Sequence, residues 1–567
     1  MKVRTRNNSQ TSRRGPQQAT SRRVVASGYS NYFVHDWYRA GGSTFEDINA
    51  NLQELRVMSR DLFMGGSGLA TGALKTLRTN VVGPGLMLHC TPDARTLGIT
   101  PEQASEWAYG VEKRFSLWAG STDCDVANQN TFVELQQLAM LAWPMSGDCG
   151  VSLPILPRRH SRYDLRIKLI EADRICNPGS LAFTGLNQQV VKLPNGNMIT
   201  QGAEITPYGE VVAYHICNRH PLSTQWVSGQ MAGWDRVEVR GKETGRRNFL
   251  LLFTPERPEQ YRGVPILAPI IAALKQLGRY IDAELIASVT AGMFAAFITS
   301  ESTSAKGAGT TSALRAPQEL EPGMLMELNP NESVSSVNPG RPNTAFDGFL
   351  TAVTRIIGAA LEIPPEVLMK SFNASYSASR AALLEFWKMC KMYRAWLSRN
   401  FCQPVFEEWL AEDIARGYTD APGFFTDAIR RQAWCAAAWN GPAPGHIQPL
   451  QEAKAAHQRM ADLITTGAQE AQEFNGGSYE QNTIEAGLEA QRRAEHGLPA
   501  LEPVKAAEQN AAAAVSGRAG RPRSGVEDDE RFMALEDLLA GDPEMLEQLE
   551  SIKADYTERV PIVSGRA

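Results

Sequence analysis

Residues 65–76 carry the glycines, serine and lysine that a phosphate-binding loop would need. Glycine occupies positions 65, 66, 68 and 72, and Lys75 and Thr76 follow. In a phosphate-binding loop the last glycine directly precedes the lysine, so that backbone N–H groups and the amine converge on the phosphate. Two residues separate Gly72 from Lys75 here, and Leu69 stands where a nucleophile-elbow motif needs glycine. The spacing therefore predicts no nucleotide site and no serine nucleophile.

The histidines, cysteines and acidic pairs do not form a recognisable reactive group. The eight histidines have no metal-ligand spacing, and the eight cysteines include no C-x-x-C pair, which argues against zinc and a disulfide framework and is typical of a reducing cytosol. His215 and His220 flank the end of a predicted strand, where a structural role is favoured over a base or ligand. The pairs at 407–408 and 412–413 are expected on solvated helix surfaces. We expect no catalytic residue, no metal and no cofactor.

The overall charge excludes a protein that coats nucleic acid by bulk positive charge. The chain has 567 residues, 43% of them hydrophobic and 21% charged, which is enough for several packing units. Lys plus Arg number 57 and Asp plus Glu 62, so the net charge is −5. Any contact with DNA or RNA must therefore be local.

The two ends of the chain differ in composition from the rest. Residues 1–30 are basic and polar, and we expect a disordered arm that either solubilises the protein or contacts nucleic acid or a scaffold. Residues 498–567 contain a Gly/Arg-rich linker and an acidic tail, either a docking peptide or a solvated terminus. The N-terminal residues lack an apolar signal segment, and the most apolar run, 285–298, is shorter than the roughly 20 residues of a membrane span. We expect no membrane segment.

Hydrophobic periodicity predicts a mixed α+β protein. Helices are expected over 45–80, 107–118 and 132–143, and strands over 150–156, 165–172, 190–199 and 211–216. The Asn195-Gly196 pair between two apolar runs predicts a hairpin turn.

A different pattern occupies the centre of the chain. A long helix is expected over 265–298, followed by a polar loop at 300–312 and a β-like stretch over 320–342. A second helix over 344–362 ends at Ile363-Pro364-Pro365, because a residue before proline avoids the α region. After a polar stretch at 370–379, a third helix is expected over 378–410. The helices over 265–298 and 344–362 thus flank a small β-like segment.

Several short motifs accompany this pattern. They are RDL at 60–62, VVGPG at 81–85, EADRICNP at 171–178, VAYHI at 212–216 before His220-Pro221, RPEQYRGVP at 257–265, LEPG at 320–323 and NASYSASR at 373–380. In order and spacing they resemble the lambda-type portal proteins of tailed bacteriophages, over roughly residues 32–477. One departure lies at 448–452, which is QPLQE where the family tends toward Asp-Pro-x-Lys-Glu.

The resemblance implies a portal-type fold and a ring of identical subunits, twelve in the particle, at one capsid vertex. The implied parts are a mixed α/β wing at 31–262, a stem helix at 263–299, a small β-containing clip at 300–343 and a second stem helix at 344–362. They continue with a channel loop at 363–379, the second part of the wing with its long helix at 380–444, and a helical crown at 445–497. Broad apolar stripes and small residues (Ala287, Gly292, Ala295, Ala296) would suit lateral contacts between subunits.

The resemblance also implies partners and candidate site residues. Double-stranded DNA would pass through the channel, the clip would dock the terminase large subunit and then head-completion proteins, and the major capsid or scaffold protein would surround the ring. The expected location is the virion, and the host cytoplasm during assembly. The DNA-channel candidates are Lys275, Arg279, Arg355, Lys370, Ser371 and Asn373, and the clip docking candidates are Arg315, Glu319, Glu321, Glu327 and Arg341.

Each channel candidate has an alternative. The cations could form intersubunit ion pairs or remain on a solvated surface, and Ser371 and Asn373 could be turn residues. For the whole chain, the rival to a non-enzymatic portal is a hydrolase or nuclease with an unfamiliar site in the mixed region 150–220. A capsid component without a channel is a third possibility.

Overall fold

The computed structural model describes residues 43–44, 48, 51–179, 190–223, 232–293, 297–300, 332–335, 346–372, 375–444, 449–475, 477 and 479–499. The chain divides into two units, Met1–Tyr479 and Glu480–Ala567. In the second unit the described structure consists of most of helix α15, Tyr479–Glu495, and a few residues after it. The basic arm and the acidic tail lie outside the described residues. None of the helices in the described ranges is long and apolar enough to cross a membrane.

The first unit begins with helices α2, Leu52–Asp61, and α3, Gly68–Val81, joined by the π-helical turn η3, Leu62–Gly66. The prediction of one continuous helix over 45–80 is therefore wrong, because two helices occupy this range. Ser67 has an extended backbone, and its hydroxyl accepts a hydrogen bond from the Ala70 amide, so it caps a new helix. The glycine-rich segment is thus a break between two helices rather than part of one.

Helices α5, Pro101–Ala119, and α6, Phe132–Ser146, are each started by a capping box. Thr100 with Gln103, and Thr131 with Glu134, exchange side-chain and backbone hydrogen bonds at the two helix starts. Both helices lie where the apolar spacing predicts them. Three other short helices in this part of the chain are α4, Ala94–Leu97, η4, Thr122–Cys124, and η5, Ala172–Arg174.

The strands form antiparallel sheets. A three-stranded sheet has the order β3-β2-β9, with β2 at Asp148–Ser152, β3 at Lys168–Glu171 and β9 at Phe249–Phe253. A five-stranded sheet runs β4 (Val191–Lys192), β5 (Met198–Thr200), β6 (Ala203–Ile205), β7 (Val211–Cys217) and β8 (Trp234–Glu238). Val191 pairs with Ile199 around the Asn195-Gly196 turn, and Gly196 has a φ of 85°. The predicted hairpin is confirmed.

Helix α7, Ile271–Met293, follows the 3-10 turn η7, Ala268–Ile270, and helix α8 spans Phe346–Leu361. The predicted helix over 265–298 is wrong at its end, because Phe297–Ser300 is strand β10 and pairs with β11, Glu332–Ser335. Phenylalanine, isoleucine and threonine at 297–299 favour a strand. The predicted loop at 363–379 contains helix α9, Pro365–Met369, since proline is favoured in the first helical position.

The C-terminal half of the unit is helical. Helix α10, Tyr376–Leu397, continues through the π-helical turn η8, Ser398–Cys402, into α11, Gln403–Ala415, so the expected helix over 378–410 is confirmed with a local irregularity. Then come α12 (Ala428–Trp434), β12 (Ala437–Asn440), α13 (Pro449–Ala461) and α14 (Gly467–Asn475), and β12 pairs with β1, Met87–Cys90.

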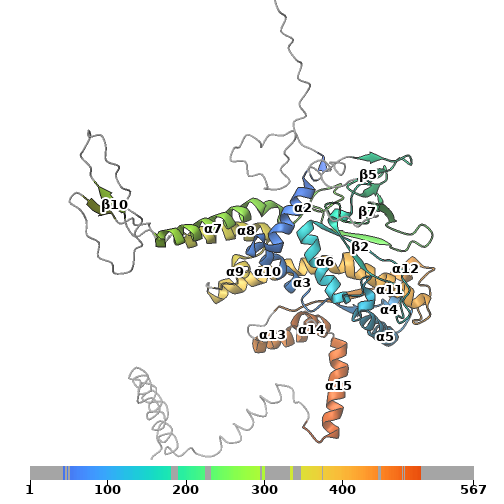
Figure 1. The fold of residues 1–567 in the computed structure, drawn as a ribbon. Helices are drawn as coiled ribbons and strands as arrows, with labels where there is room; N and C mark the ends of the chain where they lie inside the picture. Colours follow the sequence, from blue (N-terminus) through green and yellow to red (C-terminus); the bar gives the residue numbers. More distant parts are fainter. Residues whose placement is uncertain are drawn as a thin grey trace, which may run out of the picture. The chain divides into compact units, whose positions relative to one another are not determined.

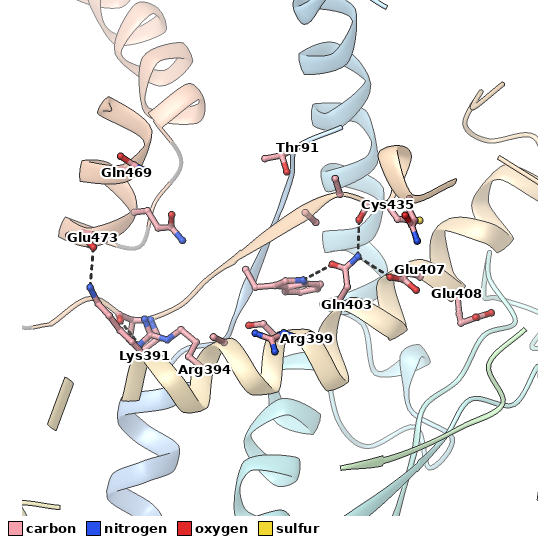
Figure 2. A pocket seen from close by; sticks show the side chains of 18 of the residues that line it. Thr91, Lys391, Arg394, Arg399, Gln403, Glu407, Glu408, Cys435, Gln469 and Glu473 are labelled. Carbon is pink, nitrogen blue, oxygen red and sulfur yellow. Dashed lines mark hydrogen bonds and ion pairs between the residues drawn. The ribbon is translucent and has the colours of Figure 1, made fainter. Parts of the chain in front are cut away.

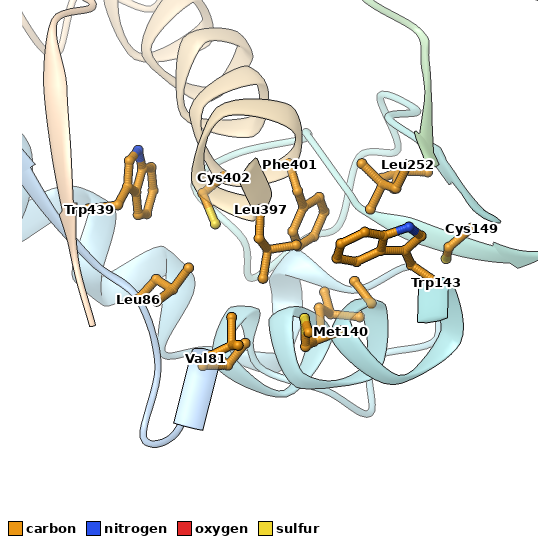
Figure 3. Close-up of a cluster of buried hydrophobic side chains, with 14 of the residues drawn as sticks. Val81, Leu86, Met140, Trp143, Cys149, Leu252, Leu397, Phe401, Cys402 and Trp439 are labelled. Atoms are coloured by element: carbon orange, nitrogen blue, oxygen red, sulfur yellow. The ribbon is translucent and has the colours of Figure 1, made fainter. Parts of the chain in front are cut away.

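A large hydrophobic core joins the helices to the three-stranded sheet, and a second buried cluster, which includes Ile205, Tyr214 and Phe249, lies at the five-stranded sheet. Figure 3 shows side chains of α3, α6, the β2 and β9 strands, α10 and η8 meeting in the large core. Trp143 stacks on Trp396 with ring centroids 3.9 Å apart, which ties α6 to α10. All eight cysteines are buried free thiols. The core therefore fixes the helical layer against the three-stranded sheet, and this is the support from which α7 starts.

Candidate functional site

The segment that leads into α7 is held by a buried network of charged groups. Arg262 has 2% of its surface exposed and Asp148 none. The Arg262 Nε donates to Asp148 Oδ2 at 2.7 Å, and its Nη2 donates to Asp148 Oδ1 at 3.0 Å and to the Ala172 carbonyl at 2.7 Å. The Nη1 donates to the Ile175 carbonyl at 2.6 Å. One guanidinium thus connects the segment before α7 with the first residue of β2, the central strand of the three-stranded sheet, and with the turn after β3.

Helix α2 contributes two further cations to the same network. Arg56 donates from Nη2 to Asp148 Oδ2 at 2.8 Å and from Nε to the Ser146 carbonyl at 2.8 Å. Arg60 donates to Asp173, whose carboxylate is also 3.5 Å from His220 Nε2. Burial alone would raise the pKa of Asp173, but the His220 hydrogen bond and the charges of Arg56 and Arg60 lower it below its usual range. The Asp173 carboxylate is therefore held ionised by side chains of α2 and of the segment after β7.

The same elements approach one another closely at two glycines. A Cβ placed on Gly263 would lie 1.8 Å from the Gly147 carbonyl oxygen, and one on Gly147 would lie 2.4 Å from the Gly263 oxygen. Gly147 also has a φ of 86°, a conformation that favours glycine. The end of α6 and the segment before α7 can therefore pack only because neither residue has a side chain.

Three of the motifs quoted from the sequence meet here. RDL at 60–62 supplies Arg60, EADRICNP at 171–178 supplies Asp173 and two carbonyl acceptors, and RPEQYRGVP at 257–265 supplies Arg262 and Gly263. Asn177 of the second motif is fully buried and accepts a hydrogen bond from the Gly202 amide. The sequence analysis missed the convergence and missed Arg56 and Asp148. A signal for Arg56 was present, because it occupies the same helical stripe as Leu52, Leu55 and Ser59.

Helices α7 and α8 lie side by side (Figure 1). The Tyr280 ring of α7 stacks on Phe346 of α8, with centroids 5.8 Å apart and an interplanar angle of 14°, and lies 4.5 Å from Phe349. Leu274 and Leu277 of α7 and Ile357 and Leu361 of α8 belong to the buried core. The two predicted helices are therefore paired, and the core holds one end of the pair.

The predicted channel residues lie on three elements. Lys275 and Arg279 are exposed one turn apart on α7, and Arg355 is exposed on α8, where it borders a hollow of about 520 Å³. Lys370 ends α9 with a φ of 53°, and Ser371 is exposed with its amide bonded to the Glu366 carbonyl. Within the described residues, no contact brings these side chains together.

The remaining predicted site residues have no structural description. Asn373 and the clip candidates Arg315, Glu319, Glu321, Glu327 and Arg341 lie outside the described residues. Of the segment 300–343, the structure describes Ser300 and the strand β11, which pairs with β10.

Helices α7 and α8 carry apolar side chains that are exposed in the single chain. Leu285 and Val289 of α7 are 61% and 59% exposed, and Ile356 of α8 is 64% exposed. Helix α8 also has exposed small residues, at Gly348, Ala352, Ala359 and Ala360. None of these residues belongs to the buried core that holds the helix pair.

The histidine and cysteine side chains that could take part in catalysis are either paired with a neighbour or buried as neutral thiols. His215 Nε2 lies 3.4 Å from Glu204, and Glu204 also accepts from Arg236 Nε at 2.6 Å and from Asn197 at 2.7 Å. Burial lowers the pKa of His215 despite the Glu204 charge. Burial raises the pKa of the Cys124 and Cys149 thiols to about 12, so both stay protonated at neutral pH. Across the described ranges, no three His, Cys, Asp or Glu side chains gather as a metal site.

Comparisons with known proteins identify a family. The profile described as "Phage portal protein, lambda family" matches residues 33–394. A probable portal protein of Halomonas phage phiHAP-1 is 23% identical over 389 residues, covering 67% of this chain and 70% of that protein.

Two solved structures are also similar. A chain in the neck of a native GTA particle with C12 symmetry has a TM-score of 0.38 and 12% identity, covering 73% of this chain and 92% of that one. A chain in the neck of an empty GTA particle with C6 symmetry also has a TM-score of 0.38 and 12% identity, covering 80% and 98%. The profile match spans more than half of the sequence and includes the buried network and both paired helices, so the chain belongs to the lambda family of phage portal proteins.

Proposed function

We propose that identical copies of this chain form a ring at one vertex of a phage capsid. Double-stranded DNA would be packaged and ejected through its axial opening. The observation that carries the proposal is the family match over residues 33–394, which includes α7 and α8. In this proposal the chain is not an enzyme, and the energy for packaging comes from a separate ATP-driven motor. Twelve subunits are the expected number in the particle.

The exposed apolar side chains of α7 and α8 support lateral contact between subunits. Leu285, Val289 and Ile356 are more than half exposed in the single chain, and burying such a side chain stabilises an interface by about 1.5–3 kcal/mol. In a ring each subunit has a neighbour on either side, and these neighbours would cover the exposed apolar side chains. The small residues of α8 would allow a neighbouring helix to approach closely.

The charge distribution supports a channel through which DNA can slide. The affinity of a protein for DNA rises with the number of phosphates that Lys and Arg neutralise. Lys275 and Arg279 are exposed and unpaired among the described residues, and a ring would repeat each of them around the axis. A few cations per subunit would thus attract the duplex without holding it at one place.

The partners follow from the same proposal. The segment 300–343, with Arg315, Glu319, Glu321, Glu327 and Arg341, would dock the terminase large subunit during packaging and head-completion proteins afterwards. Residues 363–379, with Lys370, Ser371 and Asn373, would narrow the channel, and 445–497 would form the crown. The major capsid or scaffold protein would contact the outside of the ring. The protein would assemble in the host cytoplasm and remain in the virion.

Negative-stain electron microscopy of the purified chain tests this function. Rings with a central hole are the expected result. A monodisperse monomer that cleaves DNA when a divalent metal is added would instead support the hydrolase or nuclease alternative. Closed assemblies without a hole would indicate a capsid component that has no channel.

A further inference from the structure

A hollow of about 1290 Å³ lies where α10, η8 and α11 face α12, β12 and α14 (Figure 2). Six cations line it: Arg240, Arg247, Lys391, Arg394, Arg399 and Arg431. The β8–β9 connection supplies the first two, the helix from α10 to η8 the next three, and α12 the last. Sequence analysis could not find this site, because its residues are far apart along the chain.

Two of the six cations are already engaged. Lys391 Nζ lies 3.0 Å from Glu473 Oε1 of α14, as Figure 2 shows. The Arg394 guanidinium donates to the carbonyls of Asn80 at 3.1 Å, Val81 at 3.1 Å and Pro442 at 2.7 Å. Arg394 thus fastens α10 to the end of α3, which leaves it little capacity for a ligand.

The other four arginines have no carboxylate partner in the described part of the chain. Arg240 donates to the Gly245 carbonyl, and Arg431 lies over the Phe424 ring at 5.4 Å, but neither is in an ion pair there. Arg399 is exposed and lies between the Lys391 end and the Glu407 end of the helical segment (Figure 2). The guanidinium of Arg247 makes no hydrogen bond with any described residue.

The carboxylates at the hollow are mostly committed elsewhere. Glu470 accepts two hydrogen bonds from Arg459 at 2.8 and 2.6 Å, and Glu473 is paired with Lys391. Glu408 accepts from the Arg247 amide at 3.0 Å, and Glu407 accepts from Gln403 Nε2 at 3.2 Å. A surplus of positive charge therefore remains.

The arginines are also close enough to repel one another. Burial is the main reason that the pKa of Arg247 is lowered, and the charges of Arg240 and Arg431 lower it further, while Glu407 and Glu408 act in the opposite direction. Like charges that face one another in a half-buried site disfavour the folded state unless an anion neutralises them. The Ser398 hydroxyl, which is buried at the hollow without a hydrogen-bond partner among the described residues, offers a further polar contact.

The lining fits a peptide better than a nucleic acid. Glu407, Glu408, Glu470 and Glu473 would repel a continuous row of phosphates, whereas carboxylates spaced along a peptide can reach the arginines separately. Glutamines 432, 469 and 472 can bond peptide groups, and Trp439 and prolines 442 and 444 offer apolar contacts. Arginine binds carboxylates with paired, charge-assisted hydrogen bonds.

We propose that this arginine-lined hollow binds a carboxylate-rich peptide segment, with Arg399 and Arg431 as its main contacts. This inference does not depend on the channel function. The occupant that we assign is the acidic run Glu527-Asp528-Asp529-Glu530 of this protein, which carries four successive carboxylates and so complements the surplus of arginines.

Fluorescence anisotropy with a labelled peptide of residues 524–533 tests the proposal. The receptor is the full-length chain carrying Glu527→Gln, Asp528→Asn, Asp529→Asn and Glu530→Gln, so that its own acidic run does not compete. Adding Arg399→Gln and Arg431→Gln should weaken binding about tenfold or more, and raising the salt concentration should weaken it further. The matched control adds Arg159→Gln and Lys168→Gln, two exposed cations that do not line the hollow, and should leave the affinity unchanged.

The outcomes separate the alternatives. Equal affinity in the hollow variant and the control variant would overturn the proposal, as would equal binding of a peptide whose four acids are amides. Binding of a short duplex DNA that depends on Arg399 and Arg431, without peptide binding, would overturn it in favour of nucleic acid. Weaker peptide binding by the chain with its native acidic run than by the neutralised chain supports this run as the occupant. Equal binding by these two would overturn the assignment of this run and would favour an acidic segment of a partner protein instead.

Discussion

The Arg262 guanidinium meets the Asp148 carboxylate with two hydrogen bonds, at 2.7 and 3.0 Å, where both side chains are buried. Asp148 also accepts from Arg56 at 2.8 Å and from the Gly263 amide at 3.1 Å. One carboxylate therefore joins α2, the three-stranded sheet and the start of the α7 segment. The contact therefore holds the segment that leads into α7 against the sheet.

Replacing Arg262 by methionine should destabilise the protein strongly. Removing one partner of a buried ion pair leaves the other charge without compensation and costs about 3–5 kcal/mol. We expect the thermal unfolding midpoint of Arg262→Met to fall by several degrees, as measured by circular dichroism. In the control Lys388→Met, which removes an exposed pair with Glu385, the midpoint should hardly change. Equal midpoints for the two variants would contradict this role of Arg262.

Alanine at two glycines should have opposite effects. Gly263→Ala places a methyl group 1.8 Å from the Gly147 oxygen, so the backbone must shift, and we expect loss of soluble protein or a much lower unfolding midpoint. Gly278→Ala on α7 meets no atom within 4 Å and should stabilise the helix by up to about 1 kcal/mol. The thermal unfolding midpoints of the two variants test this prediction. A normal midpoint for Gly263→Ala would disprove the close approach of Gly147 and Gly263.

Elements that depend on turn residues or on apolar periodicity could be predicted from the sequence. The Asn195-Gly196 turn and the paired apolar stripes of α7 and α8 follow from turn chemistry and periodicity, and the structure confirms them. The break at Ser67 was missed because apolar spacing continues across it. The strand at Phe297–Ser300 was missed because the predicted helix was carried through residue 298, although these residue types favour a strand, and because the pairing with residues 332–335 is not visible in the sequence.

The sites depend on contacts that no local pattern encodes. Arg262 and Asp148 are separated by 114 positions, and the hollow unites residues between 91 and 473. The motifs indicated which segments matter, but not that Arg60, Asp173 and Arg262 belong to one network. The lambda-type resemblance, in contrast, was carried by the order of the motifs, and the family match over residues 33–394 confirms it.

Acid should weaken the contact between β6 and β8. The hydrogen bond from Arg236 lowers the pKa of Glu204 from 4.5 to about 2, and Asn197 and His215 also face this carboxylate. A group with a lowered folded pKa stabilises the protein above its unfolded pKa, and this contribution is lost as the pH falls from about 4.5 to about 2. Glu204→Gln should lower the thermal midpoint at neutral pH, and its difference from the parent should shrink in acid. Because Arg236 is 40% exposed, solvent weakens the ion pair and the change in midpoint should be moderate. A difference between the two midpoints that stays constant down to about pH 3 would contradict this role of Glu204.

Replacing Lys275 and Arg279 together by glutamine should change DNA packaging or retention and leave assembly intact. Both side chains are exposed, and neither is in an ion pair within the described ranges. Removing the two charges lowers the number of phosphate contacts and the salt dependence of DNA association. The measurement is the amount of DNA retained in particles at several salt concentrations, with rings counted by electron microscopy. If rings fail to form, these side chains belong to a subunit contact.

Glutamate at the exposed apolar positions of the helix pair should prevent ring formation without unfolding the subunit. Leu285 and Ile356 are 61% and 64% exposed, so Leu285→Glu and Ile356→Glu disturb no core packing in the single chain. In a ring the new carboxylates would be buried against a neighbour without a partner, which opposes assembly. Size-exclusion chromatography with light scattering should then show monomers with a normal circular dichroism spectrum. The control Gln276→Glu adds the same charge at an exposed polar position of α7 and should still form rings. If Leu285→Glu and Ile356→Glu also form normal rings, the lateral contact uses another face of the helices.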